Sequence, residues 1–245
     1  MTVAQFVLLI AAGFGAGLIG YITGLASLVS YPALLAVGLT PVAANVTNTV
    51  ALVGAGIGAT ASSTKELAKS GRSLLWLTLW AALGGIAGAV VLLRAPEGSF
   101  EAIVPVLIVF ASTAMVLQPR IRKLAGGRTF PILYPLAIFF VAIYGGYFGA
   151  GAGVIFLALT LICTAEPIWR AALLKSYLLG VANLVAAVLF AFSGQVDWLA
   201  ALAMAIGTVG GGAVGPRVVR RLPQNPLRIA VALSGFGLAA WLWLN

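Results

Sequence analysis

Residues 20–41 read GYITGLASLVSYPALLAVGLTP, and they decide the fold because they place a glycine-containing break inside an unusually long apolar stretch. That stretch covers about residues 3–38, whereas one helix needs only about 20 apolar residues to cross a hydrocarbon core of about 30 Å. A second long stretch, 131–164, contains the break GGYFGAGAG at residues 145–153. Each stretch is therefore expected to form a helix, a break and a second, short helix.

The composition indicates that lipid, not water, surrounds this chain. Of its 245 residues 62% are hydrophobic and 8% are charged, whereas a water-facing surface needs about a quarter of its residues charged. There is no His, and Cys163 is the one Cys. Disulfides, Cys/His metal sites, His-ligated cofactors and His-based catalysis are therefore not expected. We predict an all-α integral membrane protein that is not an enzyme, with no catalytic residues, cofactor or metal.

Loop charges predict how the chain is threaded. Further apolar stretches cover 42–63, 74–93, 101–118, 171–193, 198–216 and 227–244, and the basic loops are 64–73, 119–130 and 217–228. Eight crossings would put the third basic loop opposite the other two, whereas ten membrane-entering segments put all three on one side. Since Lys and Arg stay on the cytoplasmic side, we predict ten segments with both termini outside. Charge does not distinguish short helices that cross the membrane from short helices that re-enter it.

The chain is accordingly expected to be a multi-pass protein of a bacterial-type cytoplasmic (inner) membrane, with cytoplasmic basic loops. Its formal charge of +9 lies in short loops, which is typical of membrane orientation and not of a nucleic-acid-binding face. The expected partners are therefore the lipid bilayer and a small anionic substrate, with no nucleic acid. A homodimer is left open.

An ordered set of residues recurs in the second half of the chain. At an offset of 126 or 127 residues the break, a proline, a GxxxG motif and an Arg-x-Pro motif all repeat, from Gly20, Pro41, Gly84 and Arg94 to Gly146, Pro167, Gly211 and Arg221. Because each half has five segments, an odd number, the second half begins on the opposite side of the membrane, and the second copy is inverted. We predict an inverted 5+5 repeat with two discontinuous or re-entrant helix pairs, comprising 1–118, a cytoplasmic basic linker at 119–130, and 131–245. Secondary transporters often follow this plan, with substrate held near the midplane.

The breaks supply the candidate binding groups. Unwound backbone at membrane depth is tolerated where it is buried or lines a cavity, and the free N–H groups of the short helices would attract an anion. Gly24, Gly149, Gly151 and Gly153 are the break residues singled out. GxxxG pairs such as Gly13/Gly17 and Gly84/Gly88 are instead expected to form close helix contacts.

Lys175 is the strongest single candidate, because a Lys at the bilayer centre costs about 2.5–3.5 kcal/mol on insertion scales. Its nearest acidic residue in the segment, Glu166, is about 13 Å away along a helix, so an anionic substrate could supply the missing charge. The alternative is a Lys whose ammonium reaches the cytoplasmic surface along its alkyl stem. Neighbouring and matching polar positions complete the expected site: Ser176, Tyr177, Asn45, Thr47, Asn48 and Thr49. Weaker candidates are Asn183 in the same segment as Lys175, and Thr23, Ser27 and Ser30 near the first break.

The same strings resemble a known family. GYITGLASLVSYPALLAVGLTP followed by AANVTN, and GGYFGAGAGVIFLALTLICTAEP followed by AALLKS, are similar to the TauE/SafE sulfite exporter family of membrane transporters. The resemblance covers nearly the whole chain. It implies export of small sulfur-containing anions such as sulfite or organosulfonates, with the glycine breaks and the neighbouring Thr, Asn and Ser residues lining the path.

We therefore expect a secondary transporter that exports such an anion by alternating access. Outward movement of one negative charge gains about 2.3 kcal/mol per 100 mV when the cytoplasm is negative, so export needs no coupled ion. The alternatives are an anion channel, a transporter or importer of another small anion, an intramembrane enzyme, and a membrane subunit without transport activity.

Overall fold

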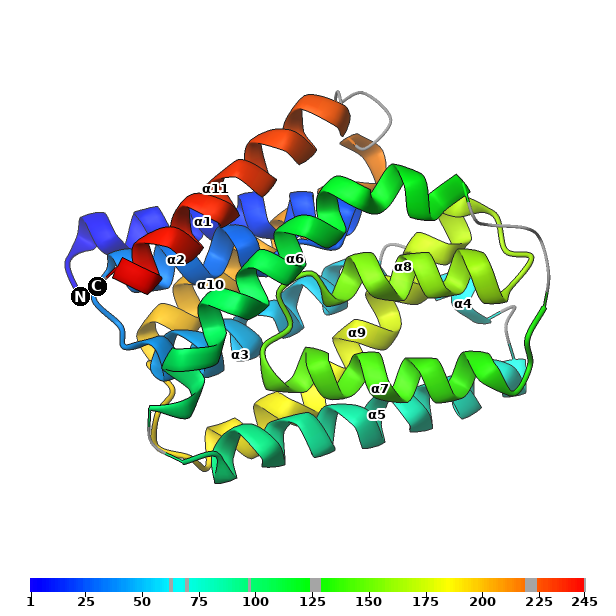
Figure 1. Ribbon diagram of the computed structural model, residues 1–245, viewed down its shortest axis with the longest axis horizontal. Coiled ribbons are helices and arrows are strands. Elements are labelled where there is room, and N and C mark those ends of the chain that lie inside the picture. Colours follow the sequence, from blue (N-terminus) through cyan, green and yellow to red (C-terminus); the bar gives the residue numbers. More distant parts are fainter. Residues whose placement is uncertain (62–63, 69–70, 97, 124–128, 219–223, 245) are drawn as a thin grey trace.

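The computed structural model describes residues 1–245 except 62–63, 69–70, 97, 124–128, 219–223 and 245, and every regular element in the described part is a helix (Figure 1). The helices are α1 (Val3–Thr23), α2 (Ser27–Ala36), α3 (Pro41–Ala61), α4 (Thr64–Ala68), α5 (Gly71–Arg94), α6 (Ser99–Lys123), α7 (Leu133–Tyr147), α8 (Ala152–Cys163), α9 (Ile168–Ala191), α10 (Trp198–Val218) and α11 (Gln224–Leu244).

The predicted all-α membrane architecture is confirmed. Five helices, α1, α3, α5, α9 and α10, are long and apolar enough to cross a membrane, and α2, α6, α7, α8 and α11 contain shorter apolar segments. Each predicted segment therefore corresponds to a helix. Two details differ from the sequence expectation: α6 continues to Lys123, inside the expected linker 119–130, and the basic loop 64–73 contains the short α4. Lys and Arg are good helix formers, so charge ends the apolar segment without ending the helix.

The two long apolar stretches form helical hairpins. In the first, α2 returns alongside α1: a Cβ added to Gly15 would lie 3.8 Å from Val29, and Gln5 Nε2 donates to the carbonyl of Val37 at 3.5 Å. In the second, the backbone N–H of Phe130 donates to the carbonyl of Cys163 at 2.9 Å, which joins the two ends of the α7/α8 pair. Each short helix thus returns alongside the helix before it.

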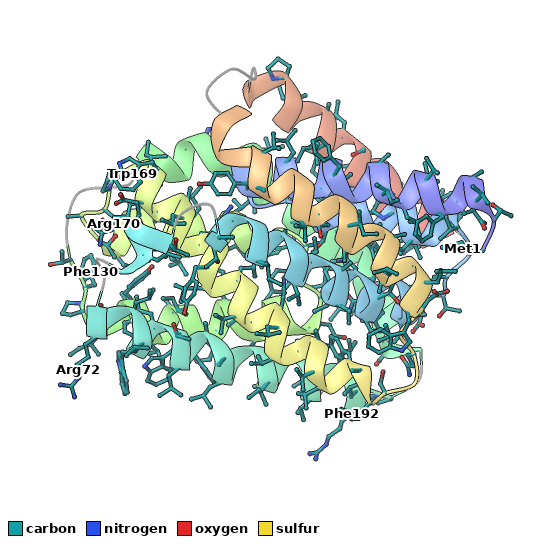
Figure 2. The ribbon with its side chains drawn as sticks, turned by 180° about the vertical axis from the view of Figure 1, so that it is seen from behind. Met1, Arg72, Phe130, Trp169, Arg170 and Phe192 are labelled. Atoms are coloured by element: carbon teal, nitrogen blue, oxygen red, sulfur yellow. The ribbon has the colours of Figure 1, made fainter. Side chains whose placement is uncertain are left out.

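The hairpins open at opposite ends of the molecule (Figure 1). The α1/α2 hairpin leads directly into α3, and Val42 of α3 lines a hollow with Glu101 and Gln195. The turns that contain Glu101 and Asp197 lie at this end, which we call the acidic-turn end. The α7/α8 hairpin opens at the other end, where Phe130 and Cys163 line a second hollow. In Figure 2, Arg72, Phe130 and Trp169 gather at this second end, opposite Met1.

The tips of the two hairpins meet inside the protein. Gly24, with φ of 83°, ends α1 in the left-handed conformation that glycine adopts at little cost. A Cβ added to Gly153, in the first turn of α8, would lie 2.5 Å from the Cα of Gly24. The two backbones therefore touch, and only glycine fits at this contact. Gly149 and Gly151 give the second tip its left-handed turns.

Glycine pairs hold the long helices together, as the sequence predicts. A Cβ at Gly13 or Gly17 would meet the backbone of α10, and a Cβ at Gly84 or Gly88 would meet the backbone of α7. Without a hydrophobic driving force between helices in lipid, such close backbone approach supplies the packing energy. These interfaces fix α1 and α7, and hence the two tips, within the bundle.

Candidate functional site

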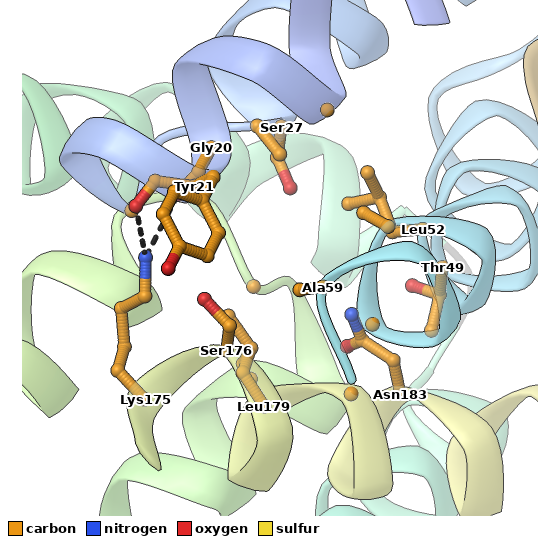
Figure 3. A pocket seen from close by; sticks show the side chains of 18 of the residues that line it. Gly20, Tyr21, Ser27, Thr49, Leu52, Ala59, Lys175, Ser176, Leu179 and Asn183 are labelled. Atoms are coloured by element: carbon orange, nitrogen blue, oxygen red, sulfur yellow. Dashed lines mark hydrogen bonds between the residues drawn. The ribbon is translucent and has the colours of Figure 1, made fainter. Parts of the chain in front are cut away.

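A pocket lies where the hairpin tips meet α3 and α9 (Figure 3). About 50 Å³ of it is open to the centre of a water molecule. One water needs about 10–15 Å³ on this measure, so the space holds a compact ion of a few heavy atoms. The polar side chains that line the pocket come from α1, α2, α3 and α9: Tyr21, Ser27, Thr49, Lys175, Ser176 and Asn183.

Helical periodicity brings these side chains to one place. On α9, Lys175, Leu179 and Asn183 follow at intervals of four residues, with Ser176 beside the first, so they share one helix face. On α3, Thr49, Leu52 and Ala59 line the opposite wall. The rest of the wall consists mainly of glycine and alanine, whose small size makes the space: Gly17, Gly20, Gly24, Ala26, Ala55, Gly56, Gly145, Gly149 and Gly180.

Lys175 is buried, with 1% of its surface exposed. Its Nζ donates to the carbonyl oxygens of Gly20 at 2.8 Å and Tyr21 at 2.9 Å, and it lies 5.8 Å from the centre of the Tyr21 ring. The side chain therefore ends at the broken end of α1 and does not extend to the cytoplasmic surface. No Asp or Glu is among the described residues that line the pocket.

The first turn of α2 adds a second source of positive potential. Ala26 and Ser27, at the start of this helix, line the pocket, and no side chain caps the helix N-terminus. The N–H groups of Leu28 and Val29 already donate to backbone carbonyls, so it is the helix dipole that favours an anion at this end. α8 also begins without a side-chain cap, and Gly149, just before it, contributes to the same wall. An ammonium and a helix start thus face one small space.

Five of the predicted site residues line this pocket, namely Gly24, Gly149, Lys175, Ser176 and Asn183. The three polar residues predicted on α3 lie beside it: Asn45 and Asn48 hold the hairpins, and Thr47 holds the turn before α10. Asn45 Nδ2 donates to the carbonyl of Tyr147 at 2.8 Å, Asn48 Nδ2 donates to Ser27 Oγ at 3.1 Å, and Thr47 Oγ1 accepts the backbone N–H of Asp197 at 3.0 Å. Thr49 is the member of this run that faces the pocket.

Three further predicted residues also lie outside the pocket lining. A Cβ on Gly151 would meet Ala111 of α6, and Gly153 contacts Gly24 at the tips. Tyr177 lies on another face of α9, where its hydroxyl accepts a hydrogen bond from Thr78 Oγ1 at 3.1 Å. Two residues, or about 200° of helical rotation, separate it from Lys175, so it lies away from the face that lines the pocket.

Sequence reasoning missed Tyr21 and the small-residue wall of Gly56 and Gly180. Gly56 and Gly180 approach so closely that a Cβ on Gly56 would lie 2.8 Å from the Cα of Gly180. In the sequence, these glycines are indistinguishable from those that serve only helix packing. The position of Tyr21, 126 residues before Tyr147 at the matching break, is the one signal that could have identified it.

An aromatic layer separates the pocket from the acidic-turn end of the molecule. Phe148 lines the central pocket and Phe100 lines the hollow at that end, and the centres of their rings lie 5.9 Å apart. Tyr31 packs edge-on against Phe148 at 5.5 Å. All three side chains are at most 2% exposed, so they block passage in this conformation.

The hollow lined by Phe130 and Cys163 is larger than the central pocket, with about 380 Å³ open to the centre of a water molecule. The acidic and basic side chains that line it, however, already pair with each other. Arg170 Nε lies 3.2 Å from Glu166 Oε2 in an ion pair on its rim. The central pocket, which combines a buried cation with a helix start, is therefore the better candidate for anion binding.

Comparisons with known proteins identify the family of the chain. The model of the family described as Sulfite exporter TauE/SafE matches residues 9–242. A "Probable membrane transporter protein" of Haemophilus influenzae is 26% identical over 238 residues, which are 95% of this chain and 92% of the relative. The "Probable membrane transporter protein YfcA" of Escherichia coli K12 is 26% identical over 93% of this chain and 85% of its own length. YunE of Bacillus subtilis, also a "Probable membrane transporter protein", is 25% identical over 94% of this chain and 96% of its own. No solved structure matches the chain significantly.

Proposed function

The chain belongs to the TauE/SafE sulfite exporter family of membrane transport proteins, and on that premise we propose that it is a secondary transporter exporting a small sulfur-containing anion of the sulfite or organosulfonate type. The central pocket carries the proposal. Its wall combines the ammonium of Lys175 and the start of α2, which favour an anion, with the hydroxyls of Thr49 and Ser176. These hydroxyls donate to the carbonyls of Asn45 and Ala172 and would have to rotate to donate to a bound oxyanion.

We propose further that residues 1–118 and 131–245 are two inverted repeats joined by a cytoplasmic linker at 119–130, with all basic loops facing the cytoplasm of a cytoplasmic membrane. The helix packing supports an exchange of α1, α2, α3, α5 and α6 with α7, α8, α9, α10 and α11. α1 packs along α10 as α7 packs along α5, and α3 packs along α10 as α9 packs along α5. The hairpins, α1/α2 and α7/α8, open at opposite ends, as such an exchange requires.

Alternating access fits the closed aromatic layer better than a channel does. The pocket is lined by the last two turns of α1, by Thr49 to Ala59 of α3 and by the middle third of α9, and so lies near the middle of the bundle. Tyr31, Phe100 and Phe148 block it on the side of the acidic turns. We assign this conformation as inward-facing, and rocking of one repeat against the other would separate Phe100 of α6 from Phe148 at the second tip.

A binding screen with purified protein tests the proposal. Sulfite, thiosulfate, sulfate, sulfoacetate and taurine are added separately, and thermal unfolding is followed, because a ligand of the folded state raises its apparent stability. At least one sulfur anion should raise the Tm of the wild type and leave that of Ser176→Leu unchanged, because the larger side chain fills the pocket. Ser234→Leu, at an exposed position of α11 that does not line the pocket, is the matched control and should keep the response. The absence of a response to every anion, or an equal response in Ser176→Leu, would contradict the proposal.

A further inference from the structure

The end of α1 presents carbonyl groups inside the membrane that need partners. The helix ends at Thr23. The last four carbonyls of any helix have no N–H donor within the helix. Gly24 N donates to the carbonyl of Gly20 at 2.8 Å, which leaves that oxygen a second lone pair. These oxygens also form the negative end of the helix dipole. The structure therefore offers a site of partial negative charge at the first break.

The ammonium of Lys175 occupies this site. It lies 2.8 Å and 2.9 Å from the oxygens of Gly20 and Tyr21, with the Tyr21 ring 5.8 Å away, a distance at which the ring face attracts a cation. Discontinuous helices of secondary transporters commonly use unwound carbonyls and half-helix C-terminal ends to hold a coupling Na⁺ or H⁺. Here a side chain from α9 provides the positive charge.

We propose that Lys175 is a tethered substitute for a coupling cation: its ammonium fills a monovalent-cation site made by the carbonyl oxygens of Gly20 and Tyr21, so that transport requires no dissolved cation. The part of this inference that concerns transport rests on the proposed function. Because the tethered cation stays with the protein, the charge that crosses the membrane is that of the anion alone. The membrane potential therefore suffices to drive export.

The second break shows that a charge is not needed merely to satisfy a carbonyl. At the end of α7 the carbonyl of Tyr147, which is 126 residues after Tyr21, accepts a hydrogen bond from the neutral carboxamide of Asn45 at 2.8 Å. Each break is thus capped by a side chain from the first long helix after the opposite hairpin. A cation caps the carbonyls of the first break, whereas a neutral carboxamide caps the carbonyl of the second. The positive charge of Lys175 is therefore a feature of the first break.

Chemical rescue tests the proposal. Lys175→Ala removes the ammonium and leaves room, so methylammonium should bind in its place. We expect the Tm of Lys175→Ala to rise by about 3–6 °C at ten times the dissociation constant of methylammonium. Choline, which is too large for the vacated space, should not raise it at equal chloride concentration. Lys175→Met is the matched control: it also removes the charge, but its side chain fills the space and should prevent rescue.

The outcomes separate this inference from the proposed function, since the measurement needs no transported anion. An equal response of wild type, Lys175→Ala and Lys175→Met, or no response of Lys175→Ala, would overturn the cation site. If Lys175→Ala does not fold alone, folded protein should be recovered in methylammonium and not in choline, and failure of that recovery has the same meaning. With any anion that the wild type transports, flux should be unchanged when Na⁺ is replaced by choline. A requirement for Na⁺ would also overturn the inference.

Discussion

Gly24→Ala probes the contact between the hairpin tips, on which the pocket depends. Gly24 has φ of 83°, and a Cβ there would meet the carbonyl carbon of Gly153 and lie 2.5 Å from the N of Val154. Two costs add. The left-handed conformation costs an L-residue about 1–2 kcal/mol, and forcing an extra carbon into a packed contact costs about 1–3 kcal/mol. The expected loss of stability is therefore about 2–5 kcal/mol.

Gly38→Ala is the matched control because Gly38 has φ of 99° with no heavy atom within 4 Å of an added Cβ. It should lose only the conformational part, about 1–2 kcal/mol. Gly153→Ala should lose only the steric part, about 1–3 kcal/mol, because Gly153 is in an ordinary helical conformation. Thermal unfolding in detergent measures all three, at about 2–4 °C per kcal/mol. If Gly24→Ala costs no more than Gly38→Ala and Gly153→Ala costs nothing, the tips do not meet and the reasoning is wrong.

Three other predictions test the surroundings of the pocket. Phe148→Ala removes the central ring of the aromatic layer, so proteoliposomes that contain this variant should leak small anions without saturation. A saturable flux without leakage would show that Phe148 does not block the path. Asn48→Leu loses hydrogen bonds to Ser27 and Ser30. The Ser30 hydroxyl keeps the carbonyl of Ala26, but the buried Ser27 hydroxyl loses its donor, for a cost of about 1–3 kcal/mol in thermal unfolding; an unchanged Tm would show that these bonds do not hold the hairpin. Gly88→Ala, whose Cβ would meet the backbone of Ile143 and Tyr147, should destabilise by about 1–3 kcal/mol. Gly237→Ala, with open space around it, should instead be neutral or stabilise by up to about 1 kcal/mol, and equal effects would argue against close α5/α7 packing.

The architecture was accessible from sequence because its signals are long and repeated. Two apolar stretches exceed one membrane crossing, and their glycine breaks coincide with the observed hairpin tips at Gly24 and at Gly149 to Gly151. Loop charge predicts the threading, since it depends only on where Lys and Arg lie, and the threading stays a prediction. Charge is equally compatible with a crossing and a returning short helix, and only the contacts of Gln5 with Val37 and of Phe130 with Cys163 distinguish them.

The site was only partly accessible because it depends on side-chain direction. Asn45 and Asn48 are polar, buried and near the break, as a ligand-binding residue would be, but their amides hold the two hairpins. Polarity at membrane depth does not reveal whether a donor faces the substrate or a backbone carbonyl. The glycine wall around Gly56 and Gly180 carries no chemical signal of its own, since its contribution is empty space.

Anion efflux from proteoliposomes under an imposed membrane potential tests the central claim most directly. The account predicts that the wild type exports a sulfur oxyanion with saturable kinetics, faster when the interior is negative, and that Lys175→Met lowers the rate at least about tenfold, equivalent to about 1.4 kcal/mol. A rate that ignores the sign of the potential, or the same rate in Lys175→Met, would contradict it.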